Sequence, residues 1–491
     1  MTDSDQFSLI SALAGTAYIA LIILFILIII MRRRPVGVSL SWLLLLFALP
    51  VAGIILFLMF GTRRLGTKRL RRAEELAPSY AEWIQHLQQV LTPDLRDGQE
   101  NTHHLNRIYN LTEHTTRIPA IPGNQLMLFH NTADIFSGLI QDIEQAQDSI
   151  HLEFYICEAG GLVDDVITAL EAAAQRGVTC RVLLDAVGSS SFFRSEAAAR
   201  LKEAGVKVRA SLPVGPIRML FERMDLRNHR KLVIIDDAIA WTGSQNLADP
   251  GLFKQDAGVG QWVDAMVRIE GPAAHVNGAV FHYDWAMETG ETIPRYHQPF
   301  EYQESFAPNS ASLHVLPSGP GIDRANIHMV LLAAIYQSQK ELIITTPYLV
   351  PDEALVTALC AAALRGVQVT LITPEKNDSR MVHYASRSYY EDLLDAGITI
   401  MHFTEGLLHT KCVLVDQETV LFGTVNLDMR SVWLNFELTL IIYDQAFGQH
   451  MAALIEEYIS RSKKVSIKDW KERRFLEKLR ENVAQLLSPL L

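Results

Sequence analysis

The sequence predicts an α/β protein in which two related domains follow an N-terminal hairpin of two transmembrane helices. Three observations support this fold class. Two long apolar segments open the chain, helix-like and strand-like segments alternate from about residue 124 onward, and the second half repeats patterns of the first. With 491 residues, 49% hydrophobic and 20% charged, the chain is long enough for two or three folded domains.

The two apolar segments are residues 9–31 and 41–61, and each is long enough to cross the hydrocarbon core of a bilayer. A cleaved signal peptide carries its cations before the apolar region, whereas here three arginines follow the first segment. We therefore predict a transmembrane hairpin over residues 1–62. More basic residues follow the second segment than lie in the connection, which favours a cytoplasmic position for the large C-terminal part. The basic residues after the second segment are Arg63, Arg64, Lys68, Arg69, Arg71 and Arg72.

Beyond the hairpin, residues 63–120 are polar and helix-prone, and we expect a helical juxtamembrane linker there. Helical spacing in residues 132–149 precedes a strand-like alternation in residues 150–157, and a helical pattern in residues 162–177 precedes an apolar strand. Residues 291–312 are rich in turn residues and lack periodicity. We therefore predict a first α/β domain over residues 121–295 and a second over residues 296–465.

The two predicted domains share sequence patterns in the same order. The segment "EAAAQRGVTCRVLLD" is echoed by "CAAALRGVQVTLITP", "LKEAGVKV" by "LLDAGITI", and "HRKLVIIDDAIAWTGSQNL" by "HTKCVLVDQETVLFGTVNL". The offsets are 180 to 192 residues, far longer than the repeat of a solenoid. Two copies at this spacing indicate a duplicated domain.

The last segment, residues 466–491, predicts an amphipathic helix. Leu476, Leu479, Val483 and Leu486 fall on one face, with basic residues around it. Such a helix can lie on a membrane surface or dock on the protein's own domain, and we favour docking.

The net charge of -11 argues against nucleic acid as a partner, because nucleic-acid binding needs a clustered cationic surface. The four cysteines lack the paired spacing of a zinc site, and we expect them to be buried and reduced. They are Cys157, Cys180, Cys360 and Cys412.

The third echo contains the pattern H-x-K-x-x-x-x-D twice. In a strand, side chains at i and i+2 share a face, so His229 should lie beside Lys231 and His409 beside Lys411. The aspartates of the two motifs, Asp236 and Asp416, lie seven positions after their histidines and so on the opposite face. They complete the two motifs and are grouped with the catalytic residues for that reason, and we expect each to hold a neighbouring loop in place.

Other carboxylates must then orient the imidazoles. Asp264 follows the first motif and Glu437 follows the second, each on an alternating strand. A carboxylate bonded to one imidazole nitrogen fixes the tautomer and raises the basicity of the other nitrogen. We expect Glu437 to serve His409; the alternative is that both acids simply face solvent.

A Gly-[Ser/Thr]-x-Asn unit follows each motif, and its glycine permits a tight turn. The side chains that can hydrogen-bond an anionic oxygen are Ser244, Asn246, Thr424 and Asn426. Together with the two lysines they predict a binding site for one phosphate. We expect no metal and no cofactor, because the lysines already supply the positive charge.

Two imidazoles facing one site suit in-line displacement at phosphorus, in which one histidine attacks and the other protonates the leaving oxygen. General acid catalysis supplies about 10²- to 10⁴-fold, whereas enzymes commonly reach about 10⁶-fold or more. Electrostatic stabilisation by the lysines and a covalent phosphohistidine must therefore supply the remainder.

The paired "HRKLVIID...GSQN" and "HTKCVLVD...GTVN" resemble the motifs of the phospholipase D superfamily. The apolar hairpin, "RMDLRNHRK", "FKQDAGVGQWVD", "TTPYLVPD" and "GTVNLDMRSVWLNFE" resemble membrane-anchored bacterial cardiolipin synthases. This resemblance implies two pseudo-symmetric α/β/α sandwich domains. It implies His229 as nucleophile, although the residues alone leave open which histidine attacks, and His409 as general acid and then base.

The resemblance also implies that Lys231, Lys411, Asn246 and Asn426 bind phosphate, while Asp264 and Glu437 orient the histidines. Arg430, Ser431 and Asn435 are further candidates for lining the site. The implied reaction joins two phosphatidylglycerol molecules into cardiolipin and releases glycerol, at the inner membrane of a bacterium. The alternatives are hydrolysis, transfer to another alcohol, cleavage of nucleic-acid diesters, and an inert membrane scaffold.

Overall fold

The computed structural model describes residues 3–32, 36–61, 65–91, 106–215, 223–292, 310–321 and 326–486. The chain forms two compact units. One consists of Met1–Leu70 with Val214–Asp225, and the other of Arg71–Pro213 with Leu226–Leu491. The predicted domain junction at residues 295 and 296 lies outside the described residues.

The first unit contains helices α1 (Asp3–Met31), α2 (Val36–Ala48) and α3 (Pro50–Phe60). The expectation of one continuous helix over residues 41–61 is wrong, because the helix is interrupted at Leu49. Proline lacks an N–H group and its ring clashes with the preceding turn, so Pro50 begins a new helix. Phe57 of α3 packs edge-on against Phe25 and Trp42, with ring centroids 5.8 Å and 5.3 Å away.

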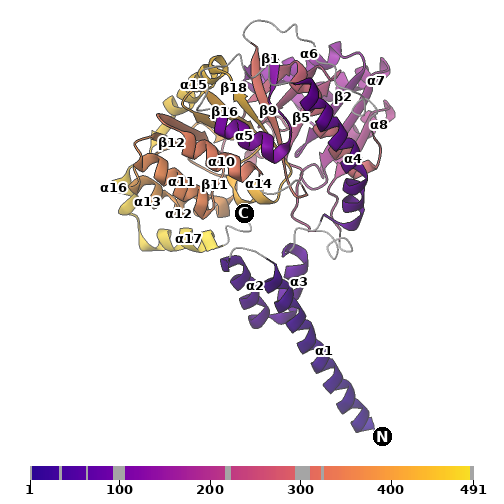
Figure 1. Ribbon diagram of the computed structural model, residues 1–491, viewed down its shortest axis with the longest axis vertical. Coiled ribbons are helices and arrows are strands. Elements are labelled where there is room, and N and C mark those ends of the chain that lie inside the picture. The colour runs from indigo at the N-terminus through magenta and orange to yellow at the C-terminus, as the bar shows by residue number, and fades with distance from the viewer. Residues whose placement is uncertain are drawn as a thin grey trace. The chain divides into compact units, whose positions relative to one another are not determined.

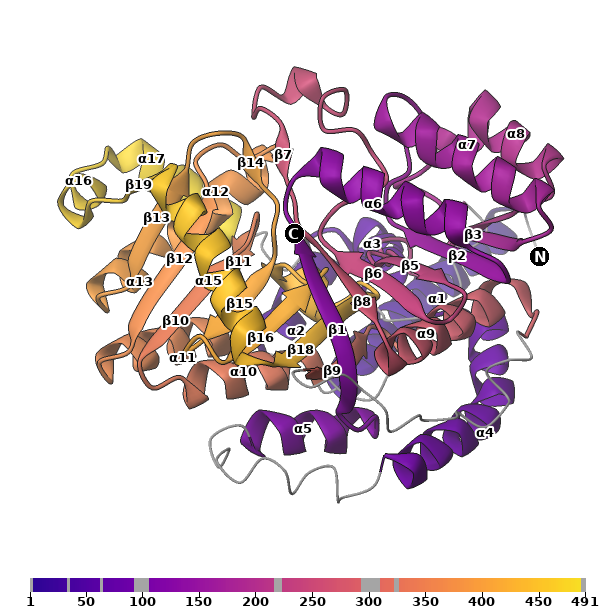
Figure 2. The same ribbon diagram turned by 90° about the horizontal axis from the view of Figure 1, so that it is seen from above.

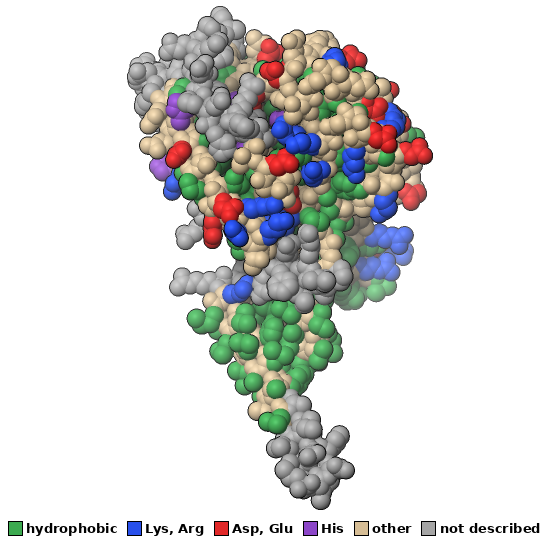
Figure 3. Space-filling model, turned by 90° about the vertical axis from the view of Figure 1, so that its right-hand side faces the viewer, with side chains coloured by type: hydrophobic (Ala, Val, Ile, Leu, Met, Phe, Trp, Pro, Cys, Tyr) green, Lys and Arg blue, Asp and Glu red, His purple; other side chains and the backbone are tan. Residues whose placement is uncertain are grey.

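No helix within the described parts of the chain is both long enough and apolar enough to cross a membrane. The predicted transmembrane hairpin is therefore not confirmed. Hydrophobic side chains nevertheless cover much of the described surface of α1 to α3 (Figure 3). The exposed ones include Leu13, Ile19, Leu24, Leu27, Ile30, Leu44, Phe47, Val51 and Ile55.

Two helices lie where the helical linker is predicted, α4 (Thr67–Val90) and α5 (Asn106–Thr116). The part of α4 within the second unit packs into the core of that unit through Trp83, Ile84 and Leu87. Its Arg72 donates hydrogen bonds to the carbonyl oxygens of Met287 and Glu288. The C-terminal part of α4 therefore belongs to the folded body.

The second unit is built on one sheet of 15 strands, in the order β19-β13-β12-β10-β15-β16-β18-β9-β1-β8-β6-β5-β2-β3-β4. Read outward from the central β9–β1 pair, β9-β18-β16-β15-β10-β12-β13 corresponds to β1-β8-β6-β5-β2-β3-β4, so the predicted duplication is visible in the topology. The strands of the first half are β1 (Ile121–Phe129), β2 (Ser149–Phe154), β3 (Thr179–Asp185), β4 (Lys207–Ser211), β5 (Lys231–Ile235), β6 (Ile239–Gly243) and β8 (Met266–Glu270).

The second half supplies the matching strands, and β19 (Ser462–Lys464) extends its edge. Strand β1 pairs antiparallel with β9, so the two halves share a continuous sheet in one compact body. The matching strands are β9 (Ala311–Ser318), β10 (Glu341–Thr345), β12 (Gln368–Pro374), β13 (Thr399–Phe403), β15 (Cys412–Val415), β16 (Thr419–Gly423) and β18 (Glu437–Tyr443).

Helices cover both faces of the sheet (Figures 1 and 2). On one face lie α9 (Pro272–Thr289) and α15 (Gln445–Ser460), over a core that runs through both halves. The other face has a separate core for each half. Its helices are α6 (Thr132–Gln145), α7 (Leu162–Gln175), α8 (Glu196–Glu203), α10 (Asn326–Gln337), α11 (Glu353–Leu364), α12 (Arg380–Ser388) and α13 (Tyr390–Asp395). The expected α/β/α layering is confirmed.

Two helices, α16 (Ile467–Lys471) and α17 (Phe475–Leu486), replace the single C-terminal helix that the sequence predicts. Helix α17 packs against α12, which agrees with the expectation that the C-terminal segment docks on the protein's own domain. All four cysteines are free thiols, and three are buried as expected. Cys360 is half-buried, so that part of the prediction is wrong.

Candidate active site

The two motif histidines lie immediately before their strands and not within them, which corrects the prediction. Each is instead held by the backbone of the opposite half. His229 N–H donates to the carbonyl of Phe436 (2.9 Å), and His409 N–H donates to that of Val263 (2.8 Å). In the second case, the short strands β14 (Leu407–Leu408) and β7 (Trp262–Val263) pair in parallel. The segment before each histidine therefore lies against the segment that carries the other half's carboxylate.

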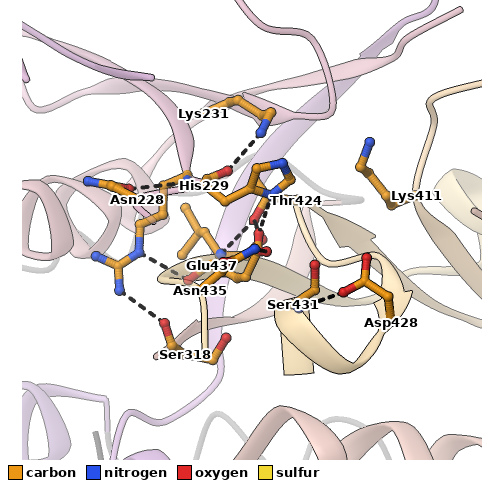
Figure 4. Close-up of polar contacts among 12 residues, drawn as sticks. Asn228, His229, Lys231, Ser318, Lys411, Thr424, Asp428, Ser431, Asn435 and Glu437 are labelled. Atoms are coloured by element: carbon orange, nitrogen blue, oxygen red, sulfur yellow. Dashed lines mark hydrogen bonds and ion pairs between the residues drawn. The ribbon is translucent and has the colours of Figure 1, made fainter. Parts of the chain in front are cut away.

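These backbone hydrogen bonds between the two halves determine which carboxylate contacts which imidazole. Nδ1 of His229 lies 2.8 Å from Oε2 of Glu437 (Figure 4), and Nδ1 of His409 lies 2.6 Å from Oδ1 of Asp264. The expectation that Glu437 serves His409 is wrong, because the pairs are crossed between the halves. The structure nevertheless brings both chosen carboxylates, Asp264 and Glu437, into contact with an imidazole.

Neighbouring side chains hold the carboxylates in turn. Thr424 donates its hydroxyl to Oε2 of Glu437 (2.6 Å), and the amide of Asn435 donates to Oε1 (3.1 Å). Ser244 donates its hydroxyl to the carbonyl of Ala265 (3.3 Å), accepts from the backbone N–H of the same residue (3.1 Å) and helps to lower the pKa of Asp264. Ser244 and Thr424 therefore orient the carboxylates, and the expectation that they donate to phosphate is not supported by these contacts.

Burial dominates the protonation of the imidazoles. It lowers the pKa of His229 and of His409 to about 4, although the facing carboxylate opposes the shift in each case. Burial would raise the pKa of Asp264 and Glu437, but pairing with the histidines holds both below their ordinary values. At neutral pH the site therefore contains two neutral imidazoles, each paired with a carboxylate.

Both motif lysines are buried close to their histidines. Nζ of Lys231 donates to the carbonyl of His229 (2.8 Å), and Nζ of Lys411 donates to that of His409 (2.5 Å). Burial lowers the pKa of Lys231 to about 8 and also lowers that of Lys411. Lys411 contributes to the lowered pKa of His229, and Lys231 to that of His409. Cations from both halves therefore act on both imidazoles, and Figure 4 shows Lys231, His229 and Lys411 pointing toward one space.

The two predicted asparagines differ in their contacts. Oδ1 of Asn246 accepts a hydrogen bond from the N–H of Ile156 (3.3 Å), whereas Oδ1 of Asn426 is buried with no hydrogen-bond partner among the described residues. Both side chains are buried. The side-chain N–H groups of Asn246 and Asn426 are therefore still candidates to donate a hydrogen bond to a phosphate oxygen.

The motif aspartates hold loops, as the sequence predicts. Asp236 accepts from the backbone N–H groups of Gln147, Asp148 and Ser149 at 2.7 to 2.8 Å. Asp416 accepts from those of Gln339, Lys340 and Glu341 at 2.8 to 2.9 Å. Each carboxylate thus fixes the start of β2 or β10, and the grouping of both with the catalytic residues is not supported by these contacts.

Sequence reasoning missed two aromatic rings beside the imidazoles. Trp262 lies 4.4 Å from His409 and Tyr155 lies 5.1 Å from His229, measured between ring centroids. It also missed the residue between His and Lys in each motif. The side chain of Arg230 donates to the carbonyl of Glu437 (3.0 Å), and that of Thr410 donates to the carbonyl of Val263 (3.3 Å). Arg230 and Thr410 occupy the same position in the two motifs, between the histidine and the lysine. This shared position is the feature of the sequence that could have identified them.

The remaining candidates lie around α14 (Met429–Trp433). The N–H of Ser431 donates to the carboxylate of Asp428 (2.7 Å), which caps this helix. Arg430 lowers the pKa of Tyr155, which burial raises. The charge of Arg430 therefore affects Tyr155 in the first half, whereas the N–H of Ser431 takes part in the N-terminal cap of α14.

Comparison with known proteins agrees with this geometry. A family model described as "Cardiolipin synthase, PLD-like domain" matches residues 139–285 and 331–459, one segment in each half. The chain belongs to this cardiolipin synthase family. The resemblance inferred from the paired motifs is confirmed.

Relatives in the cardiolipin synthase family match nearly the whole chain. Cardiolipin synthase A of Serratia proteamaculans (strain 568) is 46% identical over 94% of this chain and 95% of its own length. Cardiolipin synthase A of Edwardsiella ictaluri (strain 93-146) is 45% identical over 99% of this chain and 100% of its own length. The crystal structure of phosphatidylserine synthase from Haemophilus influenzae Rd KW20 shares the fold. It is 16% identical with a TM-score of 0.58, and it covers 79% of this chain and 100% of that chain.

Proposed function

We propose that this chain is a phosphatidyltransferase that converts two phosphatidylglycerol molecules into cardiolipin and glycerol. The observation that carries the proposal is the crossed pair of carboxylate-bound imidazoles with two buried lysines. This arrangement occurs in a chain related along nearly its whole length to cardiolipin synthases. Hydrolysis by water and transfer to another alcohol are the alternatives.

In the first step, the neutral imidazole of His229 attacks phosphorus of one phosphatidylglycerol, and the bond from phosphorus to the glycerol oxygen breaks. Protonated His409 gives its proton to that oxygen, and glycerol leaves. In the second step, His409 takes the proton of a hydroxyl of a second phosphatidylglycerol. The resulting oxygen attacks phosphorus and the N–P bond breaks, which restores His229.

The other groups support these steps. The lysines and the amides of Asn246 and Asn426 stabilise charge on the phosphoryl oxygens. A bound phosphodiester anion opposes the effect of the lysines on His409 and so favours its protonated form. Glu437 and Asp264 present the Nε2 atoms of the two imidazoles to the substrate, because their Nδ1 atoms are occupied.

We also propose that α1 to α3 attach the chain to the inner membrane of a bacterium, with the catalytic halves on the cytoplasmic side. The exposed apolar side chains of these helices support attachment. An anchored site meets lipid acceptors at high local concentration, which favours a lipid alcohol over water. The proposed partners are phosphatidylglycerol and the bilayer, with no nucleic acid.

Product analysis tests the proposal. The purified full chain is incubated with phosphatidylglycerol vesicles, and lipids and water-soluble products are quantified with and without competing alcohols. Cardiolipin and free glycerol in equal amounts are expected. Phosphatidic acid as the main product would identify a hydrolase, and a competing alcohol that displaces phosphatidylglycerol would identify a different transferase.

A further inference from the structure

Helix α17 docks on the body in the reverse of the usual orientation. An amphipathic helix normally turns its apolar face inward. Here Glu481 and Ala484 are buried, while the leucines of the predicted apolar face are exposed. We define the outward apolar face as five residues with exposed fractions of 45 to 80%: Phe475, Leu476, Leu479, Val483 and Leu486.

Specific contacts fix this orientation. Arg473 forms an ion pair with Glu481, and its guanidinium lies 3.6 Å from the ring centroid of Trp470. Trp470 is buried and packs against Tyr390 at 4.9 Å, and Lys478 pairs with Glu391 at 3.2 Å. The helix is thus anchored by its polar face, and the outward apolar face is left exposed by the described residues of the second unit.

Charge around the outward apolar face identifies the partner. Lys478 and Arg480 lie about 100° to either side of Leu479 on the helix. Lys478 is paired with Glu391 of the body, so Arg480 is the exposed cation beside the apolar stripe. From residue 466 to residue 486 the basic residues outnumber the acidic ones by six to four, in a chain with a net charge of -11. Pairing of two copies through this face would bring like charges together, whereas an anionic bilayer complements them.

The position of α17 also connects this face to the active site. Helix α17 packs against α12, which begins two residues after Asp378. The carboxylate of Asp378 accepts from the hydroxyl of Tyr348 (2.9 Å) and pairs with Lys254 (3.0 Å). Nζ of Lys254 lies 5.4 Å from the ring centroid of Trp262, the residue beside His409. Helix α17 is therefore linked to one imidazole through α12, the nearby Asp378 and the contacts of Lys254.

We propose that the outward apolar face of α17 inserts into the surface of an anionic phospholipid bilayer, as a contact separate from α1 to α3. This contact would place the catalytic body against the layer that contains its substrate. The inference goes beyond the proposed reaction. Its test measures lipid contact directly and does not depend on activity.

The test uses the full chain with Cys360 replaced by serine, since the other three cysteines are buried. A fluorophore is attached to Leu479→Cys or, as the matched control, to Glu477→Cys, an exposed position about 160° from Leu479 on the helix. The protein is placed in phosphatidylglycerol and phosphatidylcholine vesicles that contain lipids with a quencher near the headgroup. We expect quenching at position 479 to exceed that at position 477 by roughly twofold or more.

Equal quenching at the two positions would overturn the proposal. So would protection of position 479 that depends on protein concentration and not on the lipid quencher, since that result indicates contact between copies. Replacing Arg474 and Arg480 by glutamate should remove the excess quenching at position 479. Its persistence would contradict recognition through charge.

Discussion

At the scale of single residues, each imidazole depends on a carboxylate from the other half of the chain. Glu437→Gln should lower the activity by roughly 10²- to 10⁴-fold, because the amide can no longer stabilise the imidazolium or fix its tautomer. The imidazole ¹⁵N resonances of His229 should change in this variant and those of His409 in Asp264→Asn. Exposed Glu418→Gln is the matched control. The opposite assignment of resonances would contradict the crossed pairing.

The pKa values predict the pH dependence of activity. His229 must be neutral to attack, and burial lowers the pKa of His229 to about 4. Lys231 must be protonated to bind phosphate, and burial lowers the pKa of Lys231 to about 8. In the free enzyme, kcat/KM should therefore rise as pH increases toward about 4, where His229 becomes neutral, and decline above about 4, where His409 loses the proton that it must donate. The decline should become steeper as pH increases through about 8, where Lys231 loses its charge. Lys231→Arg should shift the alkaline limb upward, and an unchanged limb would assign it to another group.

The lowered pKa values of His229 and His409 also make the stability of the folded chain increase with pH. The pKa of both histidines is lower in the folded chain than the ordinary value of 6.5. As pH falls below 6.5, the unfolded chain therefore binds protons that the folded chain does not. The contribution of these histidines to stability is present above pH 6.5 and is lost as pH falls toward about 4.

At the scale of elements, Asp236 and Asp416 connect two strands of each half. Both residues have left-handed backbone conformations, with φ of 50° and 52°. Asp236→Ala should lower the free energy of unfolding by roughly 1–3 kcal/mol, because three N–H groups lose a charged acceptor. Denaturant titration of the full chain measures this loss, while activity per folded molecule should be retained.

Asp236→Asn is the matched control, because asparagine tolerates the left-handed conformation and keeps one acceptor oxygen. It should lose less stability than the alanine variant. Equal losses would show that the second oxygen of Asp236 carries most of the stabilisation.

At the scale of the whole molecule, both crossed pairs form within one chain. Full-length His229→Ala and His409→Ala should each be inactive, and an equimolar mixture should also be inactive. No single chain in the mixture has both imidazoles. Cardiolipin formation by the mixture would show that a site forms between two chains.

The sequence predicts a large part of this molecule because its main patterns are local. Spacing alone identifies the H-x-K pairs, and echoed segments in the same order, offset by 180 to 192 residues, identify the duplication. The loop-holding role of Asp236 follows from its odd separation from His229, which places the two on opposite faces of an extended chain.

The rest depends on long-range geometry that no local pattern contains. Glu437 is 208 residues from His229, and Asp264 is 145 residues from His409. Their crossing arises from backbone pairing between the halves, so the nearer carboxylate in sequence was the wrong partner. Likewise, periodicity places Leu479 and Val483 on one face of a helix but does not say whether that face turns inward.

The crossed pairing also bears on how such a chain can originate. A single half holds an imidazole without its carboxylate and a carboxylate without its imidazole. Two identical halves related by a twofold axis complete each other, because residues in an isologous interface contact reciprocally. The joined sheet thus contains, within one polypeptide, the kind of interface that a symmetric homodimer has. After fusion each half can diverge in sequence, as the different residues at the equivalent positions Arg230 and Thr410 illustrate.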